Sequence, residues 1–158
     1  MTTNESRAWE DAAKWVRIYS IITLAAVVYG LAAAHVPFIL GRPWSSCESA
    51  ASKLHCVLIF HLYEVPLVSF HAFIAWYGLK RYGRPRVHFY LLLLGVAVVV
   101  NLAFFTFESL LLLDSVREGA PAWENLGLTS IALVLITGAG LGVIVGKRIL
   151  AALYPRET

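Results

Sequence analysis

The sequence predicts an all-α integral membrane protein, a bundle of four transmembrane helices that forms a single domain over residues 1–158. Hydrophobic residues make up 59% of the chain and charged residues only 15%, whereas a soluble domain has about 25% charged residues. Four continuous apolar stretches are each long enough to cross a bilayer core of roughly 30 Å as a helix. The basic residues gather at the ends of these stretches, which is typical of polytopic membrane proteins.

The segment before the first apolar stretch predicts a short amphipathic helix. Trp9, Ala12, Ala13 and Val16 recur at helical spacing, with charged residues between them. A helix of this kind lies in the membrane interface with its apolar face toward the lipid. We therefore expect a separate interfacial helix on the cytoplasmic surface, followed by the first span.

The four predicted spans cover residues 18–40, 57–79, 87–113 and 126–146. Each has the length of about 20 apolar residues that a membrane-spanning helix needs. Because the connections are short, neighbouring helices are expected to run antiparallel. Aromatic residues near the predicted boundaries, where amphipathic rings anchor helices in the interface, are Trp15, Tyr19, Trp76, Tyr77 and Trp123.

The distribution of Lys and Arg predicts the orientation in the membrane. Three basic residues, Arg42, Lys53 and Arg117, fall on one side. Ten fall on the other side: Arg7, Lys14, Arg17, Lys80, Arg81, Arg84, Arg86, Lys147, Arg148 and Arg156. The basic side is normally cytoplasmic, so we expect both termini in the cytoplasm and the protein in the plasma membrane. The net charge of +3 does not indicate a nucleic-acid partner, because no basic groove with stacking aromatic residues accompanies it.

The two cysteines, Cys47 and Cys56, lie in or beside the first loop on the predicted outer side. That compartment permits disulfides. Eight residues separate the two, whereas redox catalysts use a close C-x-x-C pair. We expect a structural disulfide, and a metal site that includes His55 is the alternative.

The second predicted span carries ionisable residues where lipid contact would be costly. At 100° per residue, His61, Glu64 and His71 fall within a sector of about 80°, so they share one stripe of the helix. The third span adds Asn101 and Glu108, which are seven residues apart and therefore on one face. His35 lies close to the outer end of the first span.

Depths counted at ~1.5 Å per residue predict a polar site in the outer half of the bundle. His35, His61, Glu64 and Glu108 are expected to converge there, and His71 lies deeper. Imidazoles and carboxylates are ligands of iron, copper and zinc, and imidazole is an axial ligand of haem b. The first functional hypothesis is a site for a transition metal or haem b that serves electron transfer or a membrane oxidation. Its candidate ligands are His61, Glu64 and Glu108, completed by His35 or His71 and supported by Asn101.

Two further interpretations remain open. Glu64 or Glu108 would exchange protons with a neighbouring histidine in a protein that handles protons or quinols. Alternatively, the polar residues only lock helices together through hydrogen bonds, and the protein is a non-catalytic accessory or assembly subunit. No catalytic motif decides whether the protein is an enzyme.

A small-residue face on the fourth span bears on the accessory hypothesis. Gly138, Gly142 and Gly146 repeat every four residues, and such spacing lets another backbone approach closely. Packing against the first span is the expected use of this face. Packing against a second protomer or a subunit of a larger membrane complex is the alternative.

Overall fold

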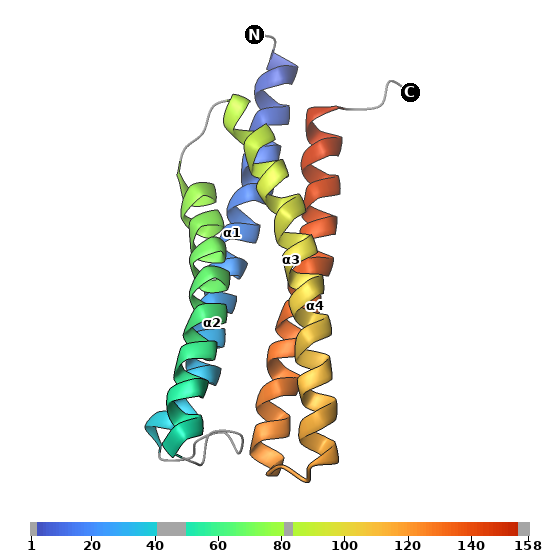
Figure 1. Ribbon diagram of the computed structural model, residues 1–158. Coiled ribbons are helices and arrows are strands. Elements are labelled where there is room, and N and C mark those ends of the chain that lie inside the picture. Colours follow the sequence, from blue (N-terminus) through green and yellow to red (C-terminus); the bar gives the residue numbers. More distant parts are fainter. Residues whose placement is uncertain (1–2, 41–49, 81–83, 155–158) are drawn as a thin grey trace.

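The computed structural model describes residues 3–40, 50–80 and 84–154, and in these ranges the chain forms four α-helices. They are α1 (Thr3–Ile39), α2 (Ala50–Leu79), α3 (Arg84–Arg117) and α4 (Ala122–Leu153). Successive helices run in opposite directions, so both ends of the chain lie at one end of the bundle (Figure 1). We call this the terminal end and the opposite one the distal end. Helix α2 packs beside α1, α4 packs beside α3, and α1 also packs on α4.

Three helical stretches in the described part of the chain are long and apolar enough to cross a membrane. They are Arg7–Ala33, Val87–Arg117 and Ala122–Leu153. Large apolar side chains cover their outward faces, and Val28, Leu92 and Val99 are each at least 60% exposed in the isolated chain. Such surfaces are stable when lipid surrounds them. The prediction of a helical membrane protein in contact with the bilayer is therefore confirmed.

The helices α3 and α4 extend beyond the predicted spans 87–113 and 126–146, and only residues 118–121 connect them. Gly119 has a φ of +72°, the left-handed conformation that glycine adopts without a steric penalty. Its N–H donates to the carbonyl of Val116 at 3.3 Å, and the N–H of Ala120 donates to the carbonyl of Ser115 at 2.9 Å. This pair of bonds is a Schellman motif, which ends α3 and turns the chain directly into α4.

The expectation of a separate interfacial helix before the first span is wrong. Those residues are the first turns of α1, which continues without interruption from Thr3 to Ile39. Ala12 and Val16 are buried in the same apolar cluster as residues of the other helices. The ring of Trp9 lies 6.3 Å from that of His88 on α3. The apolar face was correctly located, but helices rather than lipid cover it, because α3 and α4 extend far enough to pack on it.

The close-packed apolar core lies toward the terminal end. Its members include Val16 and Tyr19 on α1, Ile74 on α2, Tyr90 on α3 and Ile149 on α4. Further toward the distal end, the buried residues include many polar ones, namely His71, Asn101, Glu64, Glu108, Ser115 and Glu124. The interior of the terminal half is therefore mainly apolar, whereas the interior of the distal half also contains ionisable residues. Ionisable residues inside a membrane bundle indicate a functional site.

The glycine face of α4 packs inside the chain. A Cβ atom on Gly142 would lie 2.7 Å from Cγ2 of Val98 and 3.2 Å from the hydroxyl of Tyr19. One on Gly138 would lie 3.1 Å from Nδ2 of Asn101. The face thus serves close approach to α3, with Tyr19 as the contact from α1.

Candidate ligand-binding site in the bundle

One interaction of the predicted polar set joins α1 to α2 in the distal half. Nε2 of His35 lies 3.4 Å from Oε1 of Glu64. The two side chains differ in environment, since that of His35 is 44% exposed and that of Glu64 only 11%. The structure therefore brings together two of the predicted candidates, and it places this pair at the edge of the bundle rather than at its centre.

His71 lies on the same face of α2 as Glu64, seven residues or about 10 Å closer to the terminal end. Its side chain is more than nine-tenths buried. Nδ1 lies 2.8 Å from the carbonyl oxygen of Leu67, and because a carbonyl only accepts, Nδ1 is the donor. Among the described residues, Nε2 has no hydrogen-bond partner. In the neutral ring this nitrogen carries a lone pair.

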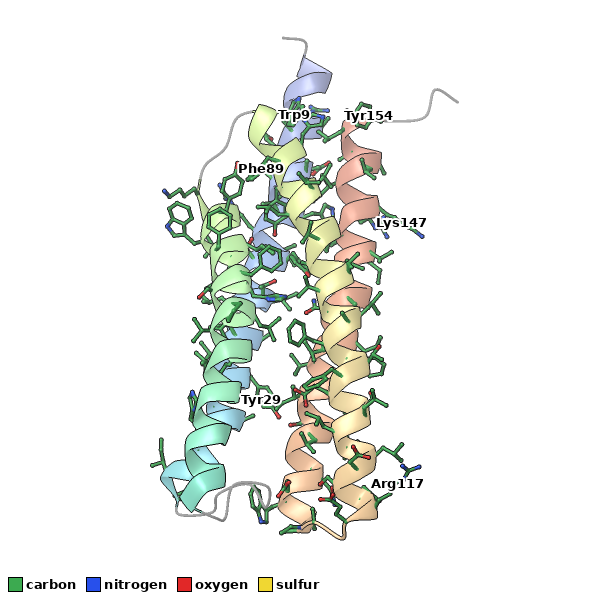
Figure 2. The ribbon with its side chains drawn as sticks, in the orientation of Figure 1. Trp9, Tyr29, Phe89, Arg117, Lys147 and Tyr154 are labelled. Carbon is green, nitrogen blue, oxygen red and sulfur yellow. The ribbon has the colours of Figure 1, made fainter. Side chains whose placement is uncertain are left out.

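A cavity of about 110 Å³ lies beside His71, and all four helices contribute to its wall. Helix α1 supplies Thr23 and Tyr29, α2 supplies His71, α3 supplies Asn101, and α4 supplies Gly138. Most of the remaining wall is aliphatic. Figure 2 shows the ring of Tyr29 extending from α1 toward the α3 and α4 pair. The cavity is thus mainly apolar, with a few polar groups from different helices, which is the usual composition of a small-molecule site.

Asn101 forms a fixed polar part of this wall. It is 4% exposed, and its Nδ2 atom sits over Gly138, where a larger residue would meet it at 3.1 Å. The hydroxyl of Tyr19, which also lines the cavity, donates to the carbonyl of Gly138 at 3.3 Å. The absence of a side chain at Gly138 therefore makes room for Asn101.

The described candidates for metal ligands form a pair, His35 and Glu64, and not a larger group. Among the residues that the structure describes, no three His, Cys, Asp or Glu side chains form a group that could hold a metal ion. Glu108 is buried on α3, but it forms no such group with His35 and Glu64. The expectation that His35, His61, Glu64 and Glu108 converge rested on depth alone, and it stays a prediction because the side chain of His61 lies outside the described residues. The side chains of His61 and Cys56, as well as Cys47, lie outside the described residues, so the disulfide and the ligand role of His61 stay predictions.

The three hydroxyl-bearing residues of the cavity wall were not identified from the sequence, which predicted an interfacial anchor at Tyr19. Tyr19 is instead 2% exposed and Thr23 is 5% exposed, and both line the cavity together with Tyr29. The sequence does contain a pattern that indicates this face. Tyr19, Thr23 and Gly30 recur at spacings of four and seven residues, and they therefore share one face of α1.

The chain matches no protein-family model, no curated protein and no solved structure in comparisons with known proteins.

Proposed function

We propose that this protein binds a small membrane-soluble molecule in the cavity, through His71 and Asn101. The observation that supports this most directly is the buried His71, which lines the cavity and whose Nε2 has no hydrogen-bond partner among the described residues. Leaving a buried acceptor unsatisfied costs roughly 1–3 kcal/mol, and natural proteins rarely accept that cost without a role for the group.

The depth of the cavity favours a ligand that arrives through the membrane. Asn101 lies close to the middle of the stretch Val87–Arg117, and Gly138 lies close to the middle of Ala122–Leu153. Two wall residues of α1, Ile22 and Tyr29, are 38% and 44% exposed, so the cavity adjoins a surface that lipid would cover. A lipophilic molecule would therefore reach the site sideways from the bilayer.

The topology that we propose has four spans and both termini in the cytoplasm. The adjacent positions of the two termini (Figure 1) and the ten basic residues on that side support it. Lys80 at the terminal end stacks 3.6 Å from the centre of the Trp76 ring, an arrangement suited to the membrane interface. Helix α2 has 30 residues and packs along α1. Both features support the proposal that α2 crosses the membrane in addition to α1, α3 and α4.

A transition metal or haem b is the second candidate ligand, and one observation favours it. The hydrogen bond from Nδ1 of His71 to the carbonyl of Leu67 is the kind that orients metal-binding histidines. The volume of about 110 Å³ is much smaller than the roughly 300–1,000 Å³ of sites for drug-sized ligands, so haem would require the helices to separate. An optical spectrum and elemental analysis of protein purified without chelator would show a Soret band or bound iron, copper or zinc if this candidate is correct.

The accessory-subunit hypothesis is not the one that we favour. Gly142 at the centre of the glycine face is buried against Val98 and Tyr19 of the same chain, so this glycine serves packing within the bundle. The large apolar residues that the helices leave exposed are suited to contact with lipid.

Native mass spectrometry of the protein released from mild detergent tests the proposed function. We expect an adduct of a few hundred daltons that His71→Phe and Ala26→Phe remove, because Ala26 lines the cavity and a phenyl ring there would fill it. The matched control is Ala25→Phe, since Ala25 is the exposed neighbour and is not part of the wall. If the wild-type protein carries no adduct and captures none from a lipid extract, the proposal is wrong.

A further inference from the structure

We infer that the ligand is a hydroxylated aromatic ring with a lipophilic tail, a molecule of the phenol or hydroquinone class whose hydroxyl group donates to Nε2 of His71. This inference rests on the proposed function and deepens it. It draws on the hydrogen-bonding state of His71, the size of the cavity and the position of its opening.

The hydrogen bond of His71 to the backbone selects a donor on the ligand. Because Nδ1 donates to the carbonyl of Leu67, the proton of the neutral ring is on Nδ1 and Nε2 only accepts. A ketone, ether or ester oxygen has no proton to offer and would meet the lone pair of Nε2 unfavourably. A hydroxyl group satisfies Nε2, so the site distinguishes alcohols and phenols from their ethers.

The dimensions of the cavity select a ring. A cavity of ~150 Å³ in a protein core accommodates a benzene molecule, and the volume of about 110 Å³ here adjoins an open side. The walls beside His71 are formed by Leu67, Val68, Val134 and Leu135, which contact an aromatic face without unsatisfied polar groups. A single six-membered ring that extends into the open side is therefore the size of group that we assign to this cavity.

Asn101 offers a place for a second oxygen atom. It projects from α3, a different helix from the one that carries His71, and both residues line the same cavity. A side-chain amide both donates and accepts hydrogen bonds, so it pairs with either a hydroxyl or a carbonyl oxygen. This capacity favours a ring with two oxygen substituents over one with a single hydroxyl.

The opening of the cavity determines where the tail lies. Ile22 and Tyr29 belong both to the wall and to the lipid-facing surface of α1. An alkyl or isoprenoid substituent leaves the site past these two residues and stays among the acyl chains, so the ligand need not leave the bilayer to bind.

The test uses para-heptylphenol and its methyl ether, para-heptylanisole, which lacks the hydroxyl proton. The full-length protein is reconstituted in lipid nanodiscs, and binding of the tritiated phenol is measured against empty nanodiscs, with the ether as competitor. We expect the phenol to bind at least roughly tenfold more tightly than the ether, the ratio that a buried hydrogen bond provides. In His71→Phe this ratio should fall to about one, and His71→Gln, which keeps an acceptor, should restore part of it.

Two results would overturn the inference, and they differ in what they mean for the proposed function. Equal binding of phenol and ether to the wild type, abolished by Ala26→Phe, would remove the hydroxyl requirement while keeping the cavity as a ligand site. No specific binding of either probe, together with no adduct in native mass spectrometry, would remove both. Thermal unfolding followed by circular dichroism establishes that each variant is folded, and His88→Phe is the control for loss of an imidazole, because His88 is exposed and lies outside the cavity wall.

Discussion

Nε2 of His35 on α1 lies 3.4 Å from Oε1 of Glu64 on α2, and this contact links the two helices in the distal half of the bundle. The imidazole of His35 is half-exposed, whereas the carboxylate of Glu64 is largely buried. The imidazole therefore lies between this carboxylate and the surface of the bundle. The link sits about 10 Å from His71 along α2, which separates it from the cavity. Its role in stability can therefore be measured apart from ligand binding.

We expect a double-mutant cycle of His35→Ala and Glu64→Ala to give a coupling free energy of ~0.6 kcal/mol, with an upper limit of about 1.7 kcal/mol. Interhelical polar contacts in membrane proteins have this range, and the exposure of His35 keeps the value low. Unfolding free energies of the four proteins in mixed detergent micelles provide the measurement. Single-mutant effects that simply add would show that the pair does not contribute to stability.

Gly142→Leu should destabilise the bundle by about 1–3 kcal/mol, the usual cost of overpacking. Its side chain would collide with Val98 and with the hydroxyl of Tyr19, forcing α3 and α4 apart. Gly140→Leu is the matched control, because Gly140 is exposed and has open space where a Cβ atom would lie. Thermal unfolding followed by circular dichroism compares the two. An unchanged melting temperature for Gly142→Leu would contradict the close packing of these helices.

Gly78→Ala should destabilise the core at the terminal end, because its methyl group would overlap Oγ of Ser20. That hydroxyl is held in place, since it donates to the carbonyl of Val16 at 2.8 Å and lies 3.0 Å from the hydroxyl of Tyr90. We expect a loss of about 1–3 kcal/mol in the free energy of unfolding.

The loss in unfolding free energy caused by Gly78→Ala should be smaller when it is combined with Ser20→Ala, because Oγ of Ser20, which the new methyl group would overlap, is then absent. Gly95→Ala, with no atom within 4 Å of the added methyl position, is the control for the change in helix propensity, and it should stabilise slightly. Equal destabilisation by Gly78→Ala in both backgrounds would show that Ser20 is not the obstacle.

Fusion reporters test the orientation. With the termini inside, as we propose from the basic residues, a green fluorescent protein fused to the C-terminus should be fluorescent in a bacterial host, and alkaline phosphatase at the same position should be inactive. Alkaline phosphatase inserted at Glu118, in the short connection between α3 and α4, should be active. The opposite pattern of activities would reverse the topology.

Much of the fold follows from local properties of the sequence. Hydropathy predicted helical membrane crossing at the stretches that become α1, α3 and α4, because a run of apolar residues of sufficient length has few other stable environments. The spacing of Glu64 and His71 likewise placed them on one face of α2, because helical periodicity is fixed by the backbone. The length of each helix was harder to predict, since α3 and α4 extend past the apolar run into polar residues.

The sequence by itself determined that this chain is a helical membrane protein with ionisable residues on an inward stripe of one helix, because length, hydropathy and periodicity are local quantities. Only the tertiary structure decided which of those residues meet. It joined His35 to Glu64 and placed His71 and Asn101 on one cavity. These outcomes depend on the rotation of each helix about its axis, because rotation determines which side chains face one another. Side-chain fit against the neighbouring helices sets that rotation, as the close contacts at Gly142 and Gly78 illustrate.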